Sequence, residues 1–239
     1  MLVCTYFTVA IMMFGQKHDT FVIVHGAWGG SWSFKQVDAI MTAKGYNVYR
    51  PNLTGLGERV HLASPEINLN THILDVVNTV LYENLHDIIL VGHSYGGMII
   101  TGVADSIPER IKKLIYLDAF VPNDGESVFT VLKNSFEAMS QDGFIIPVWV
   151  NENHPLPHDV PHPLKTLTQP ASLSNMESLS LPATYILTVD EGKIPENDDF
   201  FFFSERARER GWKTIIMTAD HNPQQTKVNE LVELLIKNI

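Results

Sequence analysis

The chain has 239 residues, of which 45% are hydrophobic and 18% charged, and its formal net charge is −10 at pH 7. This size and apolar content fit one globular domain with a large core. The acidic balance disfavours nucleic acid and anionic membrane surfaces as partners. Cys4 is the single cysteine, so a disulfide within the chain is excluded.

Residues 1–18 form an apolar N-terminal extension, which we place outside the predicted domain of residues 19–239. The apolar run 1–14 is too short to span a bilayer, and no basic residue precedes it as in a secretory signal. We therefore expect no stable membrane insertion and a cytoplasmic protein. Three roles stay open for the extension: a poor export signal or anchor, residues upstream of a start at Met12 or Met13, or an added strand.

Short apolar runs alternate with helical spacing along most of the chain. Strands are predicted over residues 20–24, 46–49, 88–91, 114–117, 184–188 and 213–217. Helices are predicted over 33–44, from a cap at Asn70 or Thr71 to about 81, from 94 to about 106, and around 228–236. The order predicts an α/β domain with a mostly parallel central sheet flanked by helices.

One stretch, residues 87–97, combines a buried strand, a tight turn and the start of a helix. The turn reads Gly92-His93-Ser94-Tyr95-Gly96, a match to the pattern G-x-S-x-G. A serine at the tip of such a turn has strained backbone angles, so its neighbours two positions away must lack side chains. The stretch therefore predicts a nucleophile elbow that carries Ser94.

A glycine-rich loop, His25-Gly26-Ala27, follows the first predicted strand. In a serine hydrolase, an N–H group from such a loop stabilises the oxyanion together with the N–H that follows the nucleophile. We therefore predict the backbone N–H groups of Ala27 and Tyr95 as the oxyanion hole. A phosphate-binding loop is disfavoured because no Gly-Lys-Ser/Thr follows.

Two ionisable residues follow the last two predicted strands, where α/β folds place their sites. They are Asp190 and His221, and the order Ser94, Asp190, His221 is that of an α/β-hydrolase triad. His221 would act as base, and the acid would hold its ring in the right tautomer. Asp118, at the end of strand 114–117, is the alternative acid.

The alternation of strand and helix breaks down over residues 120–182. This segment is rich in Pro, Asn and Ser, and it also contains Phe129, Phe136, Phe144 and Trp149. We predict a cap, inserted after the strand that ends near Asp118, that supplies an apolar substrate pocket. His154, His158 and His162 recur every four residues, but the prolines among them preclude a helix, so no metal site is predicted.

Five motifs together resemble one branch of the α/β-hydrolase superfamily. They are His25-Gly26-Ala27, the elbow at 92–97, the run Leu117-Asp118-Ala119-Phe120-Val121-Pro122, residues 185–195, and Ala219-Asp220-His221. The branch contains plant methyl esterases, related hydroxynitrile lyases and bacterial esterases of similar size. The resemblance covers residues 20–239 and implies a cofactor-free hydrolase with Ser94, Asp190 and His221 as triad and the Ala27 and Tyr95 amides as oxyanion hole.

Two departures from the lyases favour ester hydrolysis within this branch. The lyases carry a threonine where Gly26 stands and a lysine where Asn222 stands, and these groups handle the cyanohydrin. The resemblance thus implies a serine esterase that forms an acyl-enzyme, and the aromatic cap suggests a small apolar or aromatic ester. Lyase or lactonase chemistry on the same site, a non-catalytic small-molecule receptor and a homodimer stay open.

Overall fold

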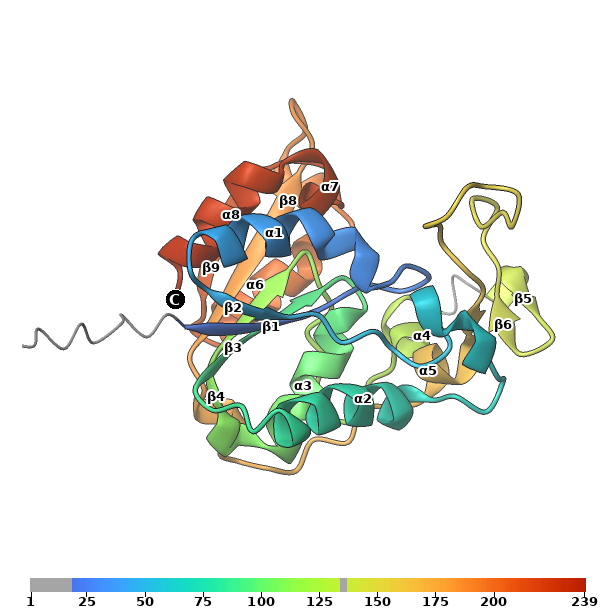
Figure 1. Ribbon diagram of the computed structural model, residues 1–239, viewed down its shortest axis with the longest axis horizontal. Coiled ribbons are helices and arrows are strands. Elements are labelled where there is room, and N and C mark those ends of the chain that lie inside the picture. The colour runs from blue at the N-terminus through green and yellow to red at the C-terminus, as the bar shows by residue number, and fades with distance from the viewer. Residues whose placement is uncertain (1–18, 134–136) are drawn as a thin grey trace, which may run out of the picture.

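The computed structural model describes residues 19–133 and 137–239 (Figure 1). The predicted N-terminal extension at 1–18 lies outside the described residues, and so does Phe136 of the predicted cap. Within the described ranges, no helix is both long and apolar enough to cross a bilayer.

A six-stranded sheet forms the centre of the protein, in the order β2-β1-β3-β4-β8-β9. Its strands are β1 (Thr20–Val24), β2 (Asn47–Tyr49), β3 (Ile88–His93), β4 (Ile111–Leu117), β8 (Ala183–Val189) and β9 (Lys213–Thr218). Every pairing among them is parallel, so all their carboxyl ends meet at one edge. The predicted α/β fold with a mostly parallel sheet is confirmed.

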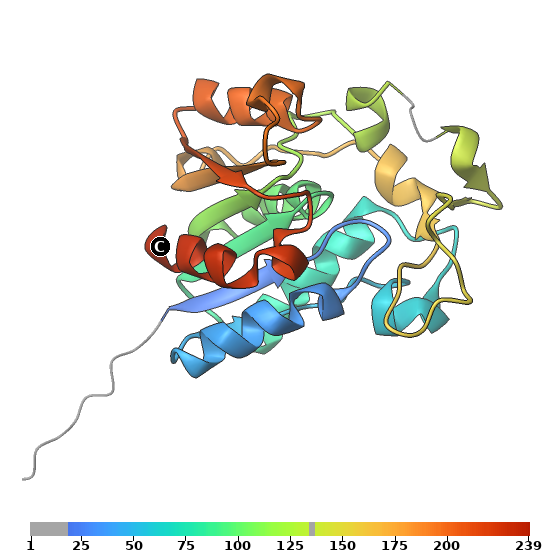
Figure 2. The same ribbon diagram turned by 90° about the horizontal axis from the view of Figure 1, so that it is seen from above.

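Helices cover both faces of the sheet, as the two views show (Figures 1 and 2). One face carries α1 (Lys35–Ala43) and α8 (Val228–Lys237), whose buried side chains join those of the strands in one core cluster. The other face carries α2 (Leu69–Tyr82), α3 (Gly96–Ser106) and α6 (Phe201–Glu209), around a second and larger cluster. The short helix α7 (Pro223–Thr226) precedes α8.

Helix α2 begins earlier than the sequence pattern predicts. Its N-cap is Asn68, whose side chain accepts a hydrogen bond from the Thr71 N–H at 3.1 Å. The Thr71 hydroxyl accepts one in return from the Asn68 N–H, which completes a capping box. The predicted cap at Asn70 or Thr71 is therefore wrong, because Thr71 is the third residue of the helix and not its start.

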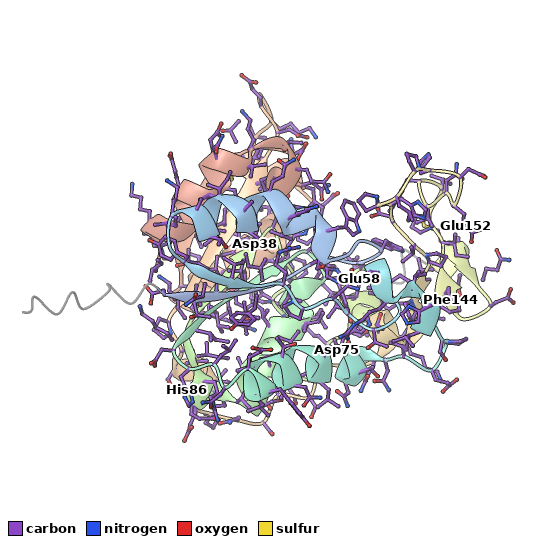
Figure 3. All side chains as sticks on the ribbon, viewed as in Figure 1. Asp38, Glu58, Asp75, His86, Phe144 and Glu152 are labelled. Atoms are coloured by element: carbon purple, nitrogen blue, oxygen red, sulfur yellow. The ribbon has the colours of Figure 1, made fainter. Side chains whose placement is uncertain are left out.

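Most of the segment between β4 and β8 lies beyond the carboxyl edge of the main sheet, and its last residues return past the end of α3 to the start of β8 (Figure 2). We call its residues 120–182 the cap. It contains the short helices α4 (Val128–Val131) and α5 (Leu164–Thr168) and a small antiparallel sheet of β5 (Ser140–Gln141), β6 (Phe144–Ile145) and β7 (His162–Pro163). Phe144, labelled in Figure 3, lies in the middle strand of this small sheet.

Two buried histidines fix the loop that follows β2. The ring of His25 accepts a hydrogen bond from the Leu53 N–H at 3.2 Å, and the ring of His72 donates one to the Thr54 carbonyl at 2.9 Å. Asp75, labelled in Figure 3, accepts from the Thr54 N–H on the same loop. Burial lowers the pKa of each histidine from 6.5 to about 4, so both rings are neutral at pH 7.

Two glycines of α3 allow a matched test of packing behind the elbow. A Cβ on Gly97 would overlap the Phe120 carbonyl oxygen, whereas one on Gly102 would overlap the end of the Ile73 side chain. Backbone cannot move aside as a side chain can, and alanine also favours a helix over glycine. We expect Gly97→Ala to lower the free energy of unfolding in urea by about 3 kcal/mol or more, and Gly102→Ala by about 1 kcal/mol or less. Similar losses in the two variants would contradict this packing.

The buried histidines should make stability depend on pH. Unfolded histidine titrates near 6.5, whereas His25 and His72 titrate near 4 in the folded protein, so the unfolded chain binds more protons between these values. The free energy of unfolding should therefore have its full value above pH 6.5 and decrease as the pH drops toward 4. Urea unfolding at pH 7 and pH 5 should show His72→Gln losing less stability than the wild type, by on the order of 1–2 kcal/mol. If the wild type and His72→Gln lost the same free energy of unfolding between pH 7 and pH 5, His72 would not contribute to this pH dependence.

Candidate active site

Ser94 lies in the turn between β3 and α3 with a backbone φ of 54°, in the left-handed region that a non-glycine residue rarely adopts. A Cβ on Gly92 would come within 2.6 Å of the Gly96 carbonyl oxygen. A Cβ on Gly96 would come within 2.7 Å of the Val24 carbonyl oxygen on the neighbouring strand. Both positions therefore require glycine, which is the elbow geometry that the sequence predicts.

His221 follows β9 and is held by an acid from the middle of the sheet. Its Nδ1 lies 2.6 Å from Oδ2 of Asp118, which directly follows β4. The other carboxylate oxygen of Asp118 accepts a hydrogen bond from the Thr188 N–H at 3.0 Å. The Asp118 side chain is only 2% exposed, against 38% for His221. A ring that donates from Nδ1 has its lone pair on Nε2, the tautomer that a general base requires.

Asp190, the acid that the sequence pattern favours, is not the partner of His221. Its carboxylate lies 2.5 Å from Nζ of Lys193, and its side chain is 46% exposed. The chain turns sharply after β8, since the Lys193 N–H bonds to the Asp190 carbonyl, and this turn brings the two side chains together. Asp190 thus does not contact the His221 ring, and Asp118, the alternative acid, occupies the position beside it.

The predicted oxyanion residues lie on two sides of Ser94. Ala27 follows β1, and Tyr95 is the N-cap residue of α3. Both line the cavity that also contains Ser94 and His221. Within residues 19–133 and 137–239, neither the Ala27 N–H nor the Tyr95 N–H has a hydrogen-bond acceptor. Backbone N–H donors that converge beside the start of a helix can stabilise an anion.

The cavity has a volume of about 620 Å³, which suits a small organic molecule. Apolar side chains from the cap, the first loop and the start of α6 line it: Trp28, Phe120, Val128, Leu132, Trp149, Leu167, Phe200 and Phe203. Its polar lining, apart from Ser94, Tyr95, Asp118 and His221, consists of Asp190, Lys193, Asp198, Asp199 and Asp220. The cavity is thus apolar inside, with an excess of carboxylates over cations.

The sequence-based interpretation identified only part of this lining. That interpretation named three cap aromatics that the structure describes. Trp149 lines the cavity, whereas Phe144 lies in strand β6 and Phe129 packs against the core. It missed Phe200, whose ring stacks on that of His221 at 4.9 Å between centroids. The sequence feature that could have pointed to Phe200 is the run of four phenylalanines at 200–203, directly after two aspartates.

His93, inside the G-x-S-x-G motif, bonds to the backbone of the loop that carries His221. Its Nε2 donates a hydrogen bond to the His221 carbonyl at 2.7 Å, and the two rings lie 4.7 Å apart. Burial, and then the neighbouring His221, lower the pKa of His93 well below 6.5, so this ring is neutral at pH 7. Among the described residues, no three His, Cys, Asp or Glu side chains gather as metal ligands.

Comparison with known proteins places this geometry in a family. Residues 21–233 match the Alpha/beta hydrolase family. The chain is 36% identical, over 90% of its length and 97% of the relative's, to a carbendazim hydrolyzing esterase from Nocardioides sp. (strain SG-4G). It is 27% identical to salicylic acid-binding protein 2 of Nicotiana tabacum, over 72% of this chain and 69% of that protein.

A solved structure agrees over nearly the whole chain. It is an extracellular alpha/beta-hydrolase from a Paenibacillus species, with a TM-score of 0.76 and 26% identity, covering 92% of this chain and 98% of that one. The relatives also include methylesterases of Arabidopsis thaliana. These findings confirm the predicted resemblance and the prediction of a carboxylic ester hydrolase. The chain belongs to the alpha/beta hydrolase family and is similar in sequence to esterases and methylesterases of that family.

Proposed function

We propose that the protein hydrolyses small carboxylic esters, with Ser94 as nucleophile, His221 as general base and Asp118 as the acid that orients His221. One observation carries this proposal. The strained serine, the Asp118–His221 pair and two N–H groups that find no acceptor among the described residues all line a single, largely apolar cavity. This is the set of groups that acyl transfer to water requires.

The reaction would proceed in two halves. In the first, the Ser94 hydroxyl oxygen attacks the ester carbonyl carbon while His221 Nε2 takes the hydroxyl proton. The tetrahedral oxyanion accepts hydrogen bonds from the Ala27 and Tyr95 N–H groups, and His221 then protonates the departing alkoxide. In the second, water attacks the acyl-enzyme with His221 again as base, which releases the carboxylic acid and restores the Ser94 hydroxyl.

Asp118 would contribute through the charge that develops on His221. When the ring takes the serine proton it becomes an imidazolium, and the carboxylate 2.6 Å from Nδ1 stabilises it. The hydrogen bond from the Thr188 N–H holds the carboxylate in place, because it fixes the second oxygen to the backbone of β8. The acid is therefore attached to the sheet itself and not to a surface turn.

The cavity favours a neutral substrate that is apolar or aromatic. Its walls present aromatic and aliphatic side chains, and its ionisable groups include several carboxylates for one lysine. An anionic ester would meet a field of the same sign. The names of the relatives agree in chemical class, since they act on carbendazim or as methylesterases.

The site does not favour hydroxynitrile lyase chemistry. Gly26 offers no hydroxyl, and a Cβ there would lie 3.1 Å from the Ser94 Cβ and 3.2 Å from the His93 ring. Asn222, where the lyases carry lysine, lines a separate cavity beyond the Ala27 loop. The groups that would handle a cyanohydrin are thus missing from the Ser94 cavity.

The direct test compares the wild type with Ser94→Ala on a series of p-nitrophenyl esters of increasing acyl length. We expect the wild type to turn over, and Ser94→Ala to lose on the order of 10⁴-fold or more in kcat, because the nucleophile is gone. The chain-length preference would then define the pocket. A wild type no faster than Ser94→Ala would contradict the proposal and leave the receptor hypothesis, tested by ligand binding to the same cavity.

The assignment of the acid is tested with two matched variants, Asp118→Asn and Asp190→Asn. Each replaces a carboxylate with an amide of the same size. We expect Asp118→Asn to lower kcat by on the order of 10⁴-fold, since the amide cannot stabilise the imidazolium and can favour the wrong tautomer. Asp190→Asn should stay within about threefold of the wild type, as its partner is Lys193. The reverse order of effects would restore Asp190 as the acid.

A further inference from the structure

We propose that His162, a residue of the cap, is a positioning residue for the oxyanion hole. Its ring holds the backbone of Trp28, and through it the neighbouring Ala27 N–H, in the geometry that receives the oxyanion. The proposal rests on the proposed ester hydrolysis, because that reaction gives the Ala27 N–H its role. It extends the site from the sheet edge into the cap.

The loop that carries Ala27 is strained immediately after that residue. Trp28 has a positive φ of 61°, and the Gly29 N–H donates a hydrogen bond to the Ala27 carbonyl at 2.7 Å. A bond from residue i+2 to residue i around a positive φ is the rare and strained form of the γ-turn. Such backbone is energetically costly and persists only where its surroundings hold it.

The surroundings that hold this turn come from the cap. The Trp28 N–H donates to His162 Nδ1 at 3.2 Å, and the Trp28 carbonyl accepts from the Val160 N–H at 2.9 Å. The indole N–H donates to the Ile145 carbonyl at 3.1 Å. All the polar groups of Trp28 thus bond to the cap, although Trp28 belongs to the loop after β1.

The side chains of Ala27 and Trp28 pack against the core, but the loop also borders two cavities. Ala27 lines the active-site cavity of about 620 Å³ and also a second cavity of about 470 Å³, which Gly29 lines too. Side-chain packing is non-directional and does not fix the orientation of a peptide group, whereas a hydrogen bond does. The hydrogen bonds to the cap therefore orient the peptide between Ala27 and Trp28.

The ring of His162 is fixed so that Nδ1 is an acceptor. The Thr166 hydroxyl donates to the Pro163 carbonyl at 2.7 Å, so toward His162 Nε2, also at 2.7 Å, it must accept. Nε2 therefore carries the proton and Nδ1 the lone pair. Burial lowers the pKa of His162 well below 6.5, so the acceptor is retained at neutral pH.

The same pair of cap residues also contacts the second oxyanion residue. The Tyr95 ring lies 5.1 Å from that of His162, edge to face, and its hydroxyl donates to His72 Nδ1 and lies beside the Thr166 hydroxyl. Tyr95 supplies the other N–H of the proposed hole. The Ala27 and Tyr95 N–H groups belong to segments that follow different strands, β1 and β3. His162 and Thr166 of the cap thus connect these two segments.

The test compares His162→Leu with His162→Asn. Leucine removes the acceptor for the Trp28 N–H, whereas the Asn side-chain oxygen can occupy the place of Nδ1. For p-nitrophenyl acetate we expect kcat to fall by about 10-fold to 10²-fold in His162→Leu, as for loss of part of an oxyanion hole. His162→Asn should recover most of that loss.

Two inhibitors separate positioning from general damage. A trifluoromethyl ketone adds to Ser94 and forms an oxyanion, whereas the matching methyl ketone binds without forming one. In His162→Leu the affinity for the trifluoromethyl ketone should fall by the same factor as kcat, and the affinity for the methyl ketone should stay within about twofold. Equal losses for both ketones, or equal losses of kcat in the Leu and Asn variants, would overturn the proposal.

Further variants keep the experiment decisive. His154→Leu removes an exposed cap histidine and should leave every value unchanged. If His162→Leu does not fold, Thr166→Val releases the His162 ring at nearly constant volume and should lower kcat without weakening the methyl ketone. A wild type no faster than Ser94→Ala would overturn the proposed function and this inference together. Full activity in His162→Leu, with Ser94→Ala inactive, would overturn the inference alone.

Discussion

The close approach of backbone around Ser94 is the constraint on which the rest of the site depends. The positive φ of Ser94 would relax if the turn could open, but it is enclosed on two sides. Gly96 lies against the backbone of β1, and Gly97 against that of Phe120, whose N–H bonds to the Ser94 carbonyl at 3.1 Å. Two neighbouring segments therefore maintain the strained turn that carries Ser94, the proposed nucleophile.

That packing also determines which carboxylate lies beside His221. Since the chain after β4 must pass against the turn at Gly97, Asp118 is buried beside the elbow before the chain continues into the cap. A buried carboxylate is costly unless it is bonded, and the Thr188 N–H and the His221 ring satisfy it. The elbow, the acid and the base are thus one packed unit at the carboxyl edge of the sheet.

The other buried histidines near the site all have lowered pKa values. His25, His72, His93 and His162 are enclosed by protein, which disfavours their charged forms. In the proposed reaction, a proton taken by His221 would therefore meet no charged ring among these four histidines, while Asp118 lies against it. The neutral rings serve as hydrogen-bond partners for backbone, and His162 extends this role from the sheet to the cap.

The sequence by itself determined the parts that depend on local pattern. The apolar run, the two glycines and the serine specify an elbow because no other residue types fit that turn, and His221 follows a strand that must end at the same edge. Tertiary structure decided which carboxylate lies beside His221, because Asp118 and Asp190 both follow strands and only the packing and the turn to Lys193 distinguish them. It also decided two contacts, the stacking of Phe200 on His221 and the hydrogen bond from Trp28 to His162. These contacts join segments that are far apart in the chain, and no sequence periodicity predicts them.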